Sequence, residues 1–203
     1  EWNLLLPVLA MVSFPVIRMS MGFGAIESAF LIAVVPLAIF PAILILGQLY
    51  KGEDWWKNQL KEGGIVALSG LMITLSLTVW LIVEFLVHHA EFGAQGTILD
   101  WIHFEVFEGE ALVGTSTLSF GLWIDSVSLM VLFVAAFLCF LICWFAIGYM
   151  TTDPINEDRN HRFFAEFILF SMGMFGMVLA DNFLWLFIFW EIMGLCSYLL
   201  IGF

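Results

Sequence analysis

Positive charge is scarce in this sequence. Six Lys and Arg stand against 18 Asp and Glu, which gives a net charge of −12, and charged residues make up 12% of the chain. Soluble domains carry about 25% charged residues, so this share is far too low for a water-soluble fold. No basic patch is available to meet phosphate groups, and we therefore expect no nucleic-acid partner.

Cysteine is also scarce. The three cysteines, Cys139, Cys143 and Cys196, all lie in apolar segments. A structural zinc site or an iron–sulfur cluster requires four ligands, and neither these residues nor the four histidines show such a spacing. We interpret the cysteines as small packing residues and expect no redox cofactor in this chain.

Apolar residues, in contrast, make up 63% of the chain and gather in long runs. A run of about 18 or more residues with few charges predicts a transmembrane helix. Six runs qualify, at about 4–21, 29–50, 65–88, 122–150, 163–180 and 183–203. The first has no basic segment before it and carries Arg18 at its far end, so we interpret it as a span rather than a signal peptide. The sequence predicts an all-α integral membrane protein, with residues 1–203 forming a single membrane region of about six helices in a lipid bilayer.

The few cations predict the orientation in the membrane. Five of the six occupy two of the loops between the runs: Lys51, Lys57, Lys61, Arg159 and Arg162. The long loop at 89–121 contains neither Lys nor Arg. Because cytoplasmic loops retain Lys and Arg, the two basic loops should face the inside and the long loop the outside.

The long outer loop carries a strand pattern. TILDWIHFEVF and GEALVGTSTLSFGLWID mix β-branched and aromatic residues with polar ones, around a turn-like EGE at 108–110. Such a pattern is typical of a β-hairpin. We predict a hairpin at the membrane surface.

One acid stands in the middle of the last run, NFLWLFIFWEIMGLCSYLLIGF. At 1.5 Å per residue, Glu191 lies about 12 Å below Phe183, where the run begins. A charge near the bilayer centre costs about 2.5–3.5 kcal/mol on insertion scales. Glu191 must therefore be protonated, face a hydrated cavity or pair with a cation. Gly194, one turn later, would let another helix approach closely.

These requirements favour a proton-transfer role for Glu191 over a purely structural buried acid. Burial favours the protonated form of a carboxylic acid and a nearby cation favours the ionised form, so a movable cation can switch its proton occupancy. No Lys or Arg lies deep in any of the six runs. Its cationic partner is therefore expected on another chain or beyond residue 203.

Three further acids have simpler interpretations. Glu166 stands four residues after Arg162, so we expect an ion pair within the helix, with a role in proton uptake as the alternative. Asp125, near the start of the fourth run, begins the fourth helix, and Asp181 lies in the short turn before the last run. Each is predicted to cap the N-terminus of the helix directly after it.

Residues 162–203, RFFAEFILFSMGMFGMVLADNFLWLFIFWEIMGLCSYLLIGF, resemble the large antiporter-like membrane subunit of complex I and related redox-driven proton pumps. This subunit is called L in bacteria, F in the chloroplast-type enzyme and 5 in mitochondria. The string WEIMGLCSYLLIGF carries most of the likeness, because related cation/proton antiporter subunits usually keep WE but vary the residues after it. LWIDSVSLMVLFV is similar to the start of the family's third helix, and VVPLAIFPAILILG, followed by residues 65–88, resembles the family's first two helices.

The resemblance implies a fold and a chemistry. The fold is part of an antiporter-like inverted repeat. Glu191 matches the family's essential glutamate, which transfers protons together with a lysine two helices later. The resemblance also implies other membrane subunits as partners, with flavin, iron–sulfur clusters and quinone held there and no redox centre in this chain. It places the chain in an energy-transducing membrane: a bacterial or archaeal plasma membrane first, then a thylakoid or mitochondrial inner membrane.

The sequence departs from the family in three ways. The run at 4–21 precedes the family's usual first helix, and Glu166 replaces an uncharged residue. The family's chain is more than twice as long, so we expect an N-terminal fragment truncated inside the first inverted repeat. Two alternatives stay open: a subunit of a multisubunit cation/proton antiporter, and a truncated, non-pumping subunit that serves assembly or anchoring.

Overall fold

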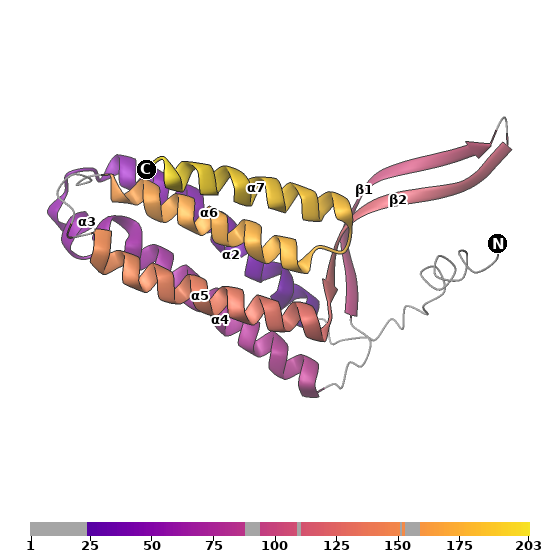
Figure 1. Cartoon of the computed structure of the whole chain (residues 1–203), viewed down its shortest axis with the longest axis horizontal. Helices are drawn as coiled ribbons and strands as arrows, with labels where there is room; N and C mark the ends of the chain where they lie inside the picture. The colour runs from indigo at the N-terminus through magenta and orange to yellow at the C-terminus, as the bar shows by residue number, and fades with distance from the viewer. Residues whose placement is uncertain (1–23, 88–93, 109–110, 151, 153–158) are drawn as a thin grey trace.

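Five long helices form an elongated bundle in the computed structural model of the chain, which describes residues 24–87, 94–108, 111–150, 152 and 159–203 (Figure 1). They are α2 (Gly24–Leu49), α4 (Gly64–Val87), α5 (Ser126–Met150), α6 (Asn160–Leu179) and α7 (Phe183–Ile201). These helices confirm five of the six predicted spans. The predicted span at 4–21 lies outside the described residues.

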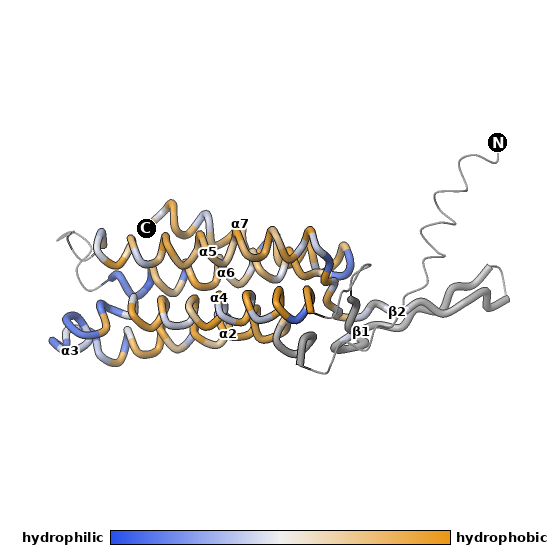
Figure 2. The backbone as a smooth tube through the Cα atoms, turned by 90° about the horizontal axis from the view of Figure 1, so that it is seen from below, coloured by the Kyte–Doolittle hydropathy of each residue, from blue (hydrophilic) through white to orange (hydrophobic). Residues whose placement is uncertain are grey.

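The helices are long and apolar enough to cross a bilayer. Their candidate spans contain 19 to 27 residues, or about 28–40 Å at 1.5 Å per residue, which matches a hydrocarbon core of about 30 Å. Apolar residues run along the whole length of the bundle (Figure 2). Many of their side chains point outward: Met130 and Phe145 of α5 are 72% and 71% exposed. Such a surface is suited to lipid, and the chain is an integral membrane protein.

Helix α6 occupies the centre of the bundle. It contacts α2, α4 and α5 on one side and α7 on the other. Its large side chains Phe164, Ile168 and Phe175 are fully buried. Helix α7 is the opposite case, because Cys196 is its one buried residue. One face of α7 packs against α6, and its first turns contact Ser119 and Phe120. Much of its remaining surface is uncovered by the described part of the chain.

The predicted hairpin is present. Strands β1 (Ala94–Glu108) and β2 (Ala111–Ile124) pair antiparallel, from Ala94 opposite Ile124 to Glu108 opposite Ala111. The register shifts at three points along the pair, which marks bulges. The hairpin extends away from one end of the helices (Figure 1). The fourth apolar run was placed at about 122–150, of which the first residues belong to β2, which continues to Ile124. Helix α5 begins at Ser126, directly after Asp125, as predicted. Leu122 and Ile124 are buried at the root of the hairpin, where alternating strand residues reach the helices.

The two predicted helix caps have different outcomes. Asp125 caps α5 as predicted: its Oδ1 accepts a hydrogen bond from the Ser128 N–H at 2.6 Å, and its own N–H donates to Ser128 Oγ at 2.8 Å. The prediction for Asp181 is wrong, because Asn182 is the residue directly before α7. Its Oδ1 accepts from the Trp185 N–H at 3.1 Å, whereas Asp181 Oδ1 accepts a hydrogen bond from the Asn182 side chain.

The end of the bundle opposite the hairpin carries the basic residues and is called the basic end below (Figure 1). Lys57 lies in the short helix α3 (Asp54–Asn58), Lys61 in the 3-10 turn η2 (Lys61–Gly63), and Arg159 directly before α6. The hairpin and the basic residues are thus at opposite ends, as the pattern of Lys and Arg predicts. Which end faces the cytoplasm stays a prediction.

A buried glutamate joins three helices at the basic end. Lys61, Glu62 and Gly63 all have positive φ angles, of 49°, 53° and 91°. This left-handed turn places the Glu62 carboxylate at the start of α6, where Oε2 accepts a hydrogen bond from the Asn160 N–H at 3.1 Å. The Asn160 side chain in turn donates to the Met150 carbonyl oxygen, the last of α5, at 3.3 Å. The start of α4, the end of α5 and the start of α6 are therefore held together, a contact that the sequence pattern did not reveal.

Candidate functional site

Glu191 lies near the middle of α7, on the face that points away from the bundle. Its side chain is exposed, and so are those of Phe187, Leu195 and Tyr198 on the same face. The structure records no ion pair and no hydrogen bond for Glu191 within the described residues. The expectation that its cationic partner lies elsewhere therefore stays a prediction.

The close approach of helices is on the opposite face from Glu191. A Cβ added to Gly173 of α6 would lie 3.1 Å from the carbonyl oxygen of Phe189, and one added to Gly176 would lie 2.6 Å from the Phe189 ring. A Cβ on Gly194 would have no neighbour within 4 Å in the described part of the chain. The small residues that let helices pack closely are thus Gly173 and Gly176, whereas the predicted approach at Gly194 is not made by these residues.

The hairpin holds the first half of α7. The Asn182 side chain donates a hydrogen bond to the Ser119 carbonyl oxygen at 2.8 Å, and the Trp185 indole N–H donates to the same oxygen at 3.1 Å. The Phe120 ring packs edge-on against Trp185, with centroids 4.2 Å apart, and lies 6.3 Å from the Phe189 ring. The orientation of the helix that bears Glu191 is therefore fixed by β2 as well as by α6. The signal in the sequence is Asn182, a preferred N-cap residue directly before the last apolar run.

Glu166 is the more enclosed of the two acids. Its side chain is 10% exposed, and its Oε1 lies 3.7 Å from Arg162, as the four-residue spacing predicts. Its Oε2 is buried and accepts no hydrogen bond from the described residues. Cys196 of α7 lies within electrostatic reach of this carboxyl group. A carboxyl group held by one long ion pair can gain or lose a proton without disrupting a hydrogen-bond network.

The two acids lie at different depths and on different faces. Glu166 lies six residues from the start of α6 at the basic end, or about 9 Å. Glu191 lies ten residues from the end of α7 at the same end, or about 15 Å. The structure does not bring the two carboxyl groups together. Glu166 is nevertheless placed between the basic end and the level of Glu191.

The three cysteines are buried side chains. Cys139, Cys143 and Cys196 are free thiols with exposures of 2% or less. Their burial in the helix interfaces confirms the interpretation as packing residues.

Comparisons with known proteins give the family context. The family described as "NADH-Ubiquinone oxidoreductase (complex I), chain 5 N-terminus" matches residues 111–164. The NAD(P)H-quinone oxidoreductase subunit 5, chloroplastic, of Zygnema circumcarinatum is 29% identical over 84% of the chain and 22% of its own length. The NADH-quinone oxidoreductase subunit L of Pseudomonas aeruginosa is 35% identical over 81% of the chain and 24% of its own length.

A third relative matches a shorter part of the chain at higher identity. The F(420)H(2) dehydrogenase subunit L of Methanosarcina mazei is 45% identical over 39% of the chain and 11% of its own length. The chain thus spans less than a quarter of the length of these relatives.

Proposed function

Because the chain belongs to the family of large antiporter-like membrane subunits of complex I-type oxidoreductases, we propose that it is part of a subunit that moves protons across the membrane. Electron transfer in partner subunits drives this movement. The observation that carries the proposal is the position of Glu191: an acid at mid-membrane depth, on a helix face that the described residues leave open. An acid at that depth requires a proton, water or a cation beside it.

In this proposal Glu191 alternates between a protonated and an ionised state. A cation approaching the outward face of α7 favours the ionised form, and its withdrawal favours proton uptake. The resemblance to the family implies that this cation is a lysine, contributed from outside residues 1–203. The close packing of α6 and α7 at Gly173 and Gly176, together with the contacts to β2, holds α7 in place while the cation moves.

Glu166 supplies protons from the basic end. Its depth between that end and Glu191, together with the loosely held Oε2, supports this role. Arg162, which is 51% exposed, reaches from the surface toward the Glu166 carboxyl group. The alternative, a purely structural ion pair, makes no contribution to proton uptake.

Flavin, iron–sulfur clusters and quinone belong to partner subunits in this proposal, and the chain itself contributes no redox centre. The relatives named NADH-quinone oxidoreductase subunit L and F(420)H(2) dehydrogenase subunit L support an assembly of several subunits. The membrane is an energy-transducing one, of the bacterial or archaeal plasma membrane type or its thylakoid or mitochondrial equivalents.

The test is Glu191→Gln in the full-length subunit within its assembled complex. We expect electron transfer to persist at a reduced rate and the number of protons moved per electron in membrane vesicles to fall. Glu191→Asp, which keeps an acid at the same place, is the matched control and should retain part of the pumping. A normal proton-to-electron ratio in Glu191→Gln would contradict the proposal.

Two other functions make different predictions. A cation/proton antiporter subunit would support sodium-dependent proton movement in vesicles that lack any electron donor. A non-pumping anchor would tolerate Glu191→Leu in both assembly and pumping. The oxidoreductase names of the relatives favour the redox-driven function over the first of these alternatives.

A further inference from the structure

A narrow pocket lies at the basic end between α2, α3, η2 and α6. Six residues line it: Gly47, Lys51, Gly52, Trp56, Glu62 and His161. All six belong to the described part of the chain, and the exposed fractions of Trp56, Glu62 and His161 are 1%, 7% and 4%. Additional protein could only cover these side chains further, so their burial does not depend on the extent of the sequence. The pocket has no room for a water molecule. Two ionisable side chains, Glu62 and His161, are thus enclosed together, apart from Glu191 and Glu166.

The His161 ring lies directly on the last turn of α2. A Cβ added to Gly47 would overlap the ring, so a glycine at this position is what lets the ring rest on the α2 backbone. The carbonyl groups in the last turn of a helix carry a partial negative charge, which stabilises a cation placed against them. A protonated His161 therefore gains from its contact with α2, whereas the neutral ring gains much less.

Glu62 brings a full negative charge to the same pocket. Its Oε2 accepts the hydrogen bond from the Asn160 N–H at 3.1 Å, so its carboxylate lies against the start of α6. The N-terminus of a helix carries a partial positive charge, which opposes a cation at His161, the second residue of α6. The Glu62 carboxylate offsets this charge. Its position depends on positive φ angles at Lys61 and Glu62, a conformation that costs non-glycine residues free energy and persists only where the surroundings hold it.

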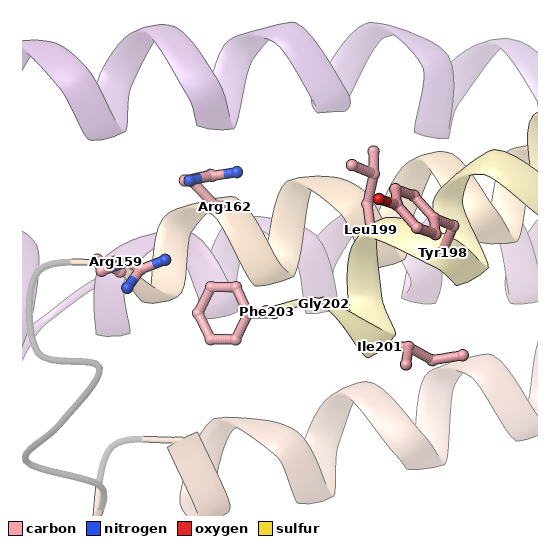
Figure 3. Close-up of a pocket in the computed structure, with 7 residues that line it drawn as sticks. All are labelled: Arg159, Arg162, Tyr198, Leu199, Ile201, Gly202 and Phe203. Atoms are coloured by element: carbon pink, nitrogen blue, oxygen red, sulfur yellow. The ribbon is translucent and has the colours of Figure 1, made fainter.

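The other charges near the pocket oppose a protonated His161 only weakly. Lys51 lines the pocket, but its side chain is exposed and its charge is screened by water and salt. Arg159 and Arg162 are near His161 in the sequence, but Figure 3 shows both beside the last turn of α7, where they line a different pocket. Arg162 also lies 3.7 Å from Glu166. Among the described residues, α2, α4, α5 and α7 contribute no charged side chain to the pocket.

We propose that His161 is a proton-binding site that tightens the basic end of the bundle as the pH falls. Histidine changes its charge between about pH 5 and about pH 8. The protonated ring is held between the Glu62 carboxylate and the last turn of α2, and it joins α2 to the starts of α4 and α6. The neutral ring lacks this attraction, so the joint opens more often. The stabilisation is therefore present at the acid end of this range and is lost as the pH rises through it. The inference does not rest on the proposed function, because the opening of the joint can be measured without turnover.

Hydrogen exchange of the full-length subunit in its purified complex tests this proposal. Mass spectrometry of peptides at about pH 6 and about pH 8, corrected for the intrinsic exchange rates, gives the protection of residues 44–50 and 160–166. We expect protection there to be about fivefold greater at the lower pH, as for one cation at a helix C-terminus. Residues 170–179, at the other end of α6, are the internal reference and should show no such change.

Three substitutions separate the charge from the packing. His161→Gln has no proton to gain in this range and should remove the pH response. Glu62→Gln can still accept the Asn160 hydrogen bond but has no charge, so it should reduce the response. Lys51→Gln is the matched control, because it alters another lining residue and keeps both ionisable partners, and it should retain the full response.

A response that persists unchanged in His161→Gln would overturn the proposal. Equal protection at the two pH values in the unaltered protein would also overturn it, and this result needs no variant to assemble. Lower protection at the acid pH would be contrary as well, since it would show that the cost of burying the charge outweighs the attraction to Glu62 and α2.

Discussion

Asn182 and Ser119 are 63 residues apart in the sequence, yet the Asn182 side chain donates a hydrogen bond of 2.8 Å to the Ser119 carbonyl oxygen. The same side chain caps α7 through the Trp185 N–H. One residue therefore begins the helix that bears Glu191 and attaches this helix to the hairpin. The hairpin is a structural support for the candidate site and not merely a connection between two helices.

Asn182→Ala should destabilise the start of α7. Loss of an N-cap side chain costs about 1 kcal/mol. The Ser119 carbonyl oxygen would still accept the hydrogen bond from the Trp185 indole N–H. We expect a lower melting temperature of the purified complex and a fall in proton pumping larger than the fall in electron transfer. Asp181→Ala is the control, because Asp181 contacts the Asn182 side chain but does not cap α7. Equal effects of the two substitutions would contradict the assignment of the cap.

The interface between α6 and α7 should be destabilised by a side chain added at Gly173. A Cβ there meets the backbone of α7, at 3.1 Å from the Phe189 oxygen and 3.2 Å from the Met193 nitrogen, so α7 must move away by a few tenths of an ångström. Overpacking of this kind costs about 1–3 kcal/mol. Gly148→Ala in α5 is the control, because its Cβ would meet none of the described residues within 4 Å and alanine is the better helix former. Thermal unfolding of the two variants side by side gives the comparison, and a stable Gly173→Ala would be the contrary result.

The cap at Asp125 predicts a dependence of stability on pH. Burial raises the pKa of Asp125, but hydrogen bonds from the Ser128 N–H and hydroxyl, with smaller ones from Trp123 and Val127, outweigh it and leave the pKa below its ordinary value of 3.8. A lowered pKa in the folded state means that the ionised cap stabilises fully above about pH 4. This stabilisation is lost as the pH falls through the lower, folded-state pKa.

Melting temperatures measured between pH 6 and pH 3 test this sign. The unaltered protein should lose stability over the acid part of the range more steeply than Asp125→Asn, which keeps a capping side chain but has no proton to gain there. Parallel curves for the two proteins would show that Asp125 contributes nothing to the acid sensitivity.

Much of the architecture could be predicted because a bilayer imposes simple rules on a sequence. Runs of apolar residues gave five helices within a few residues of their bounds, and the mixture of β-branched and aromatic residues gave the hairpin. The caps show where such rules fail. Asp181 and Asn182 are both good N-cap residues. Asn182 is the cap because α7 begins at Phe183, and the sequence does not show at which residue the helix begins.

The long-range contacts were beyond sequence reasoning for a different reason. Glu62 stands in a polar loop and looks like a solvated acid. Three residues in the left-handed conformation direct its carboxylate toward the N-terminus of α6 instead. Likewise, an apolar run shows that a helix is removed from water, but it does not show which side chains face lipid and which face other helices. Glu191 stands in a strongly apolar segment, yet its side chain lies on the outward face of α7. Glu166 is the acid that the bundle encloses.

Glu166→Gln separates a proton-uptake role from a structural ion pair. If Glu166 passes protons inward, its amide replacement should slow proton uptake from the basic-end side several-fold, and the deficit should grow as the pH rises and protons become scarce. Assembly and melting temperature should change little, because the pair with Arg162 is long and half exposed, and such pairs contribute about 0–1 kcal/mol.

The matched control is Arg162→Gln, which breaks the same ion pair and leaves the carboxyl group of Glu166 in place. A structural ion pair predicts the same result for both variants, since either one removes the contact. A proton-uptake role predicts that Glu166→Gln is the more severe, because a glutamine cannot carry a proton and a glutamate without its arginine still can. Stopped-flow pH measurements on vesicles containing the complex would distinguish the two outcomes.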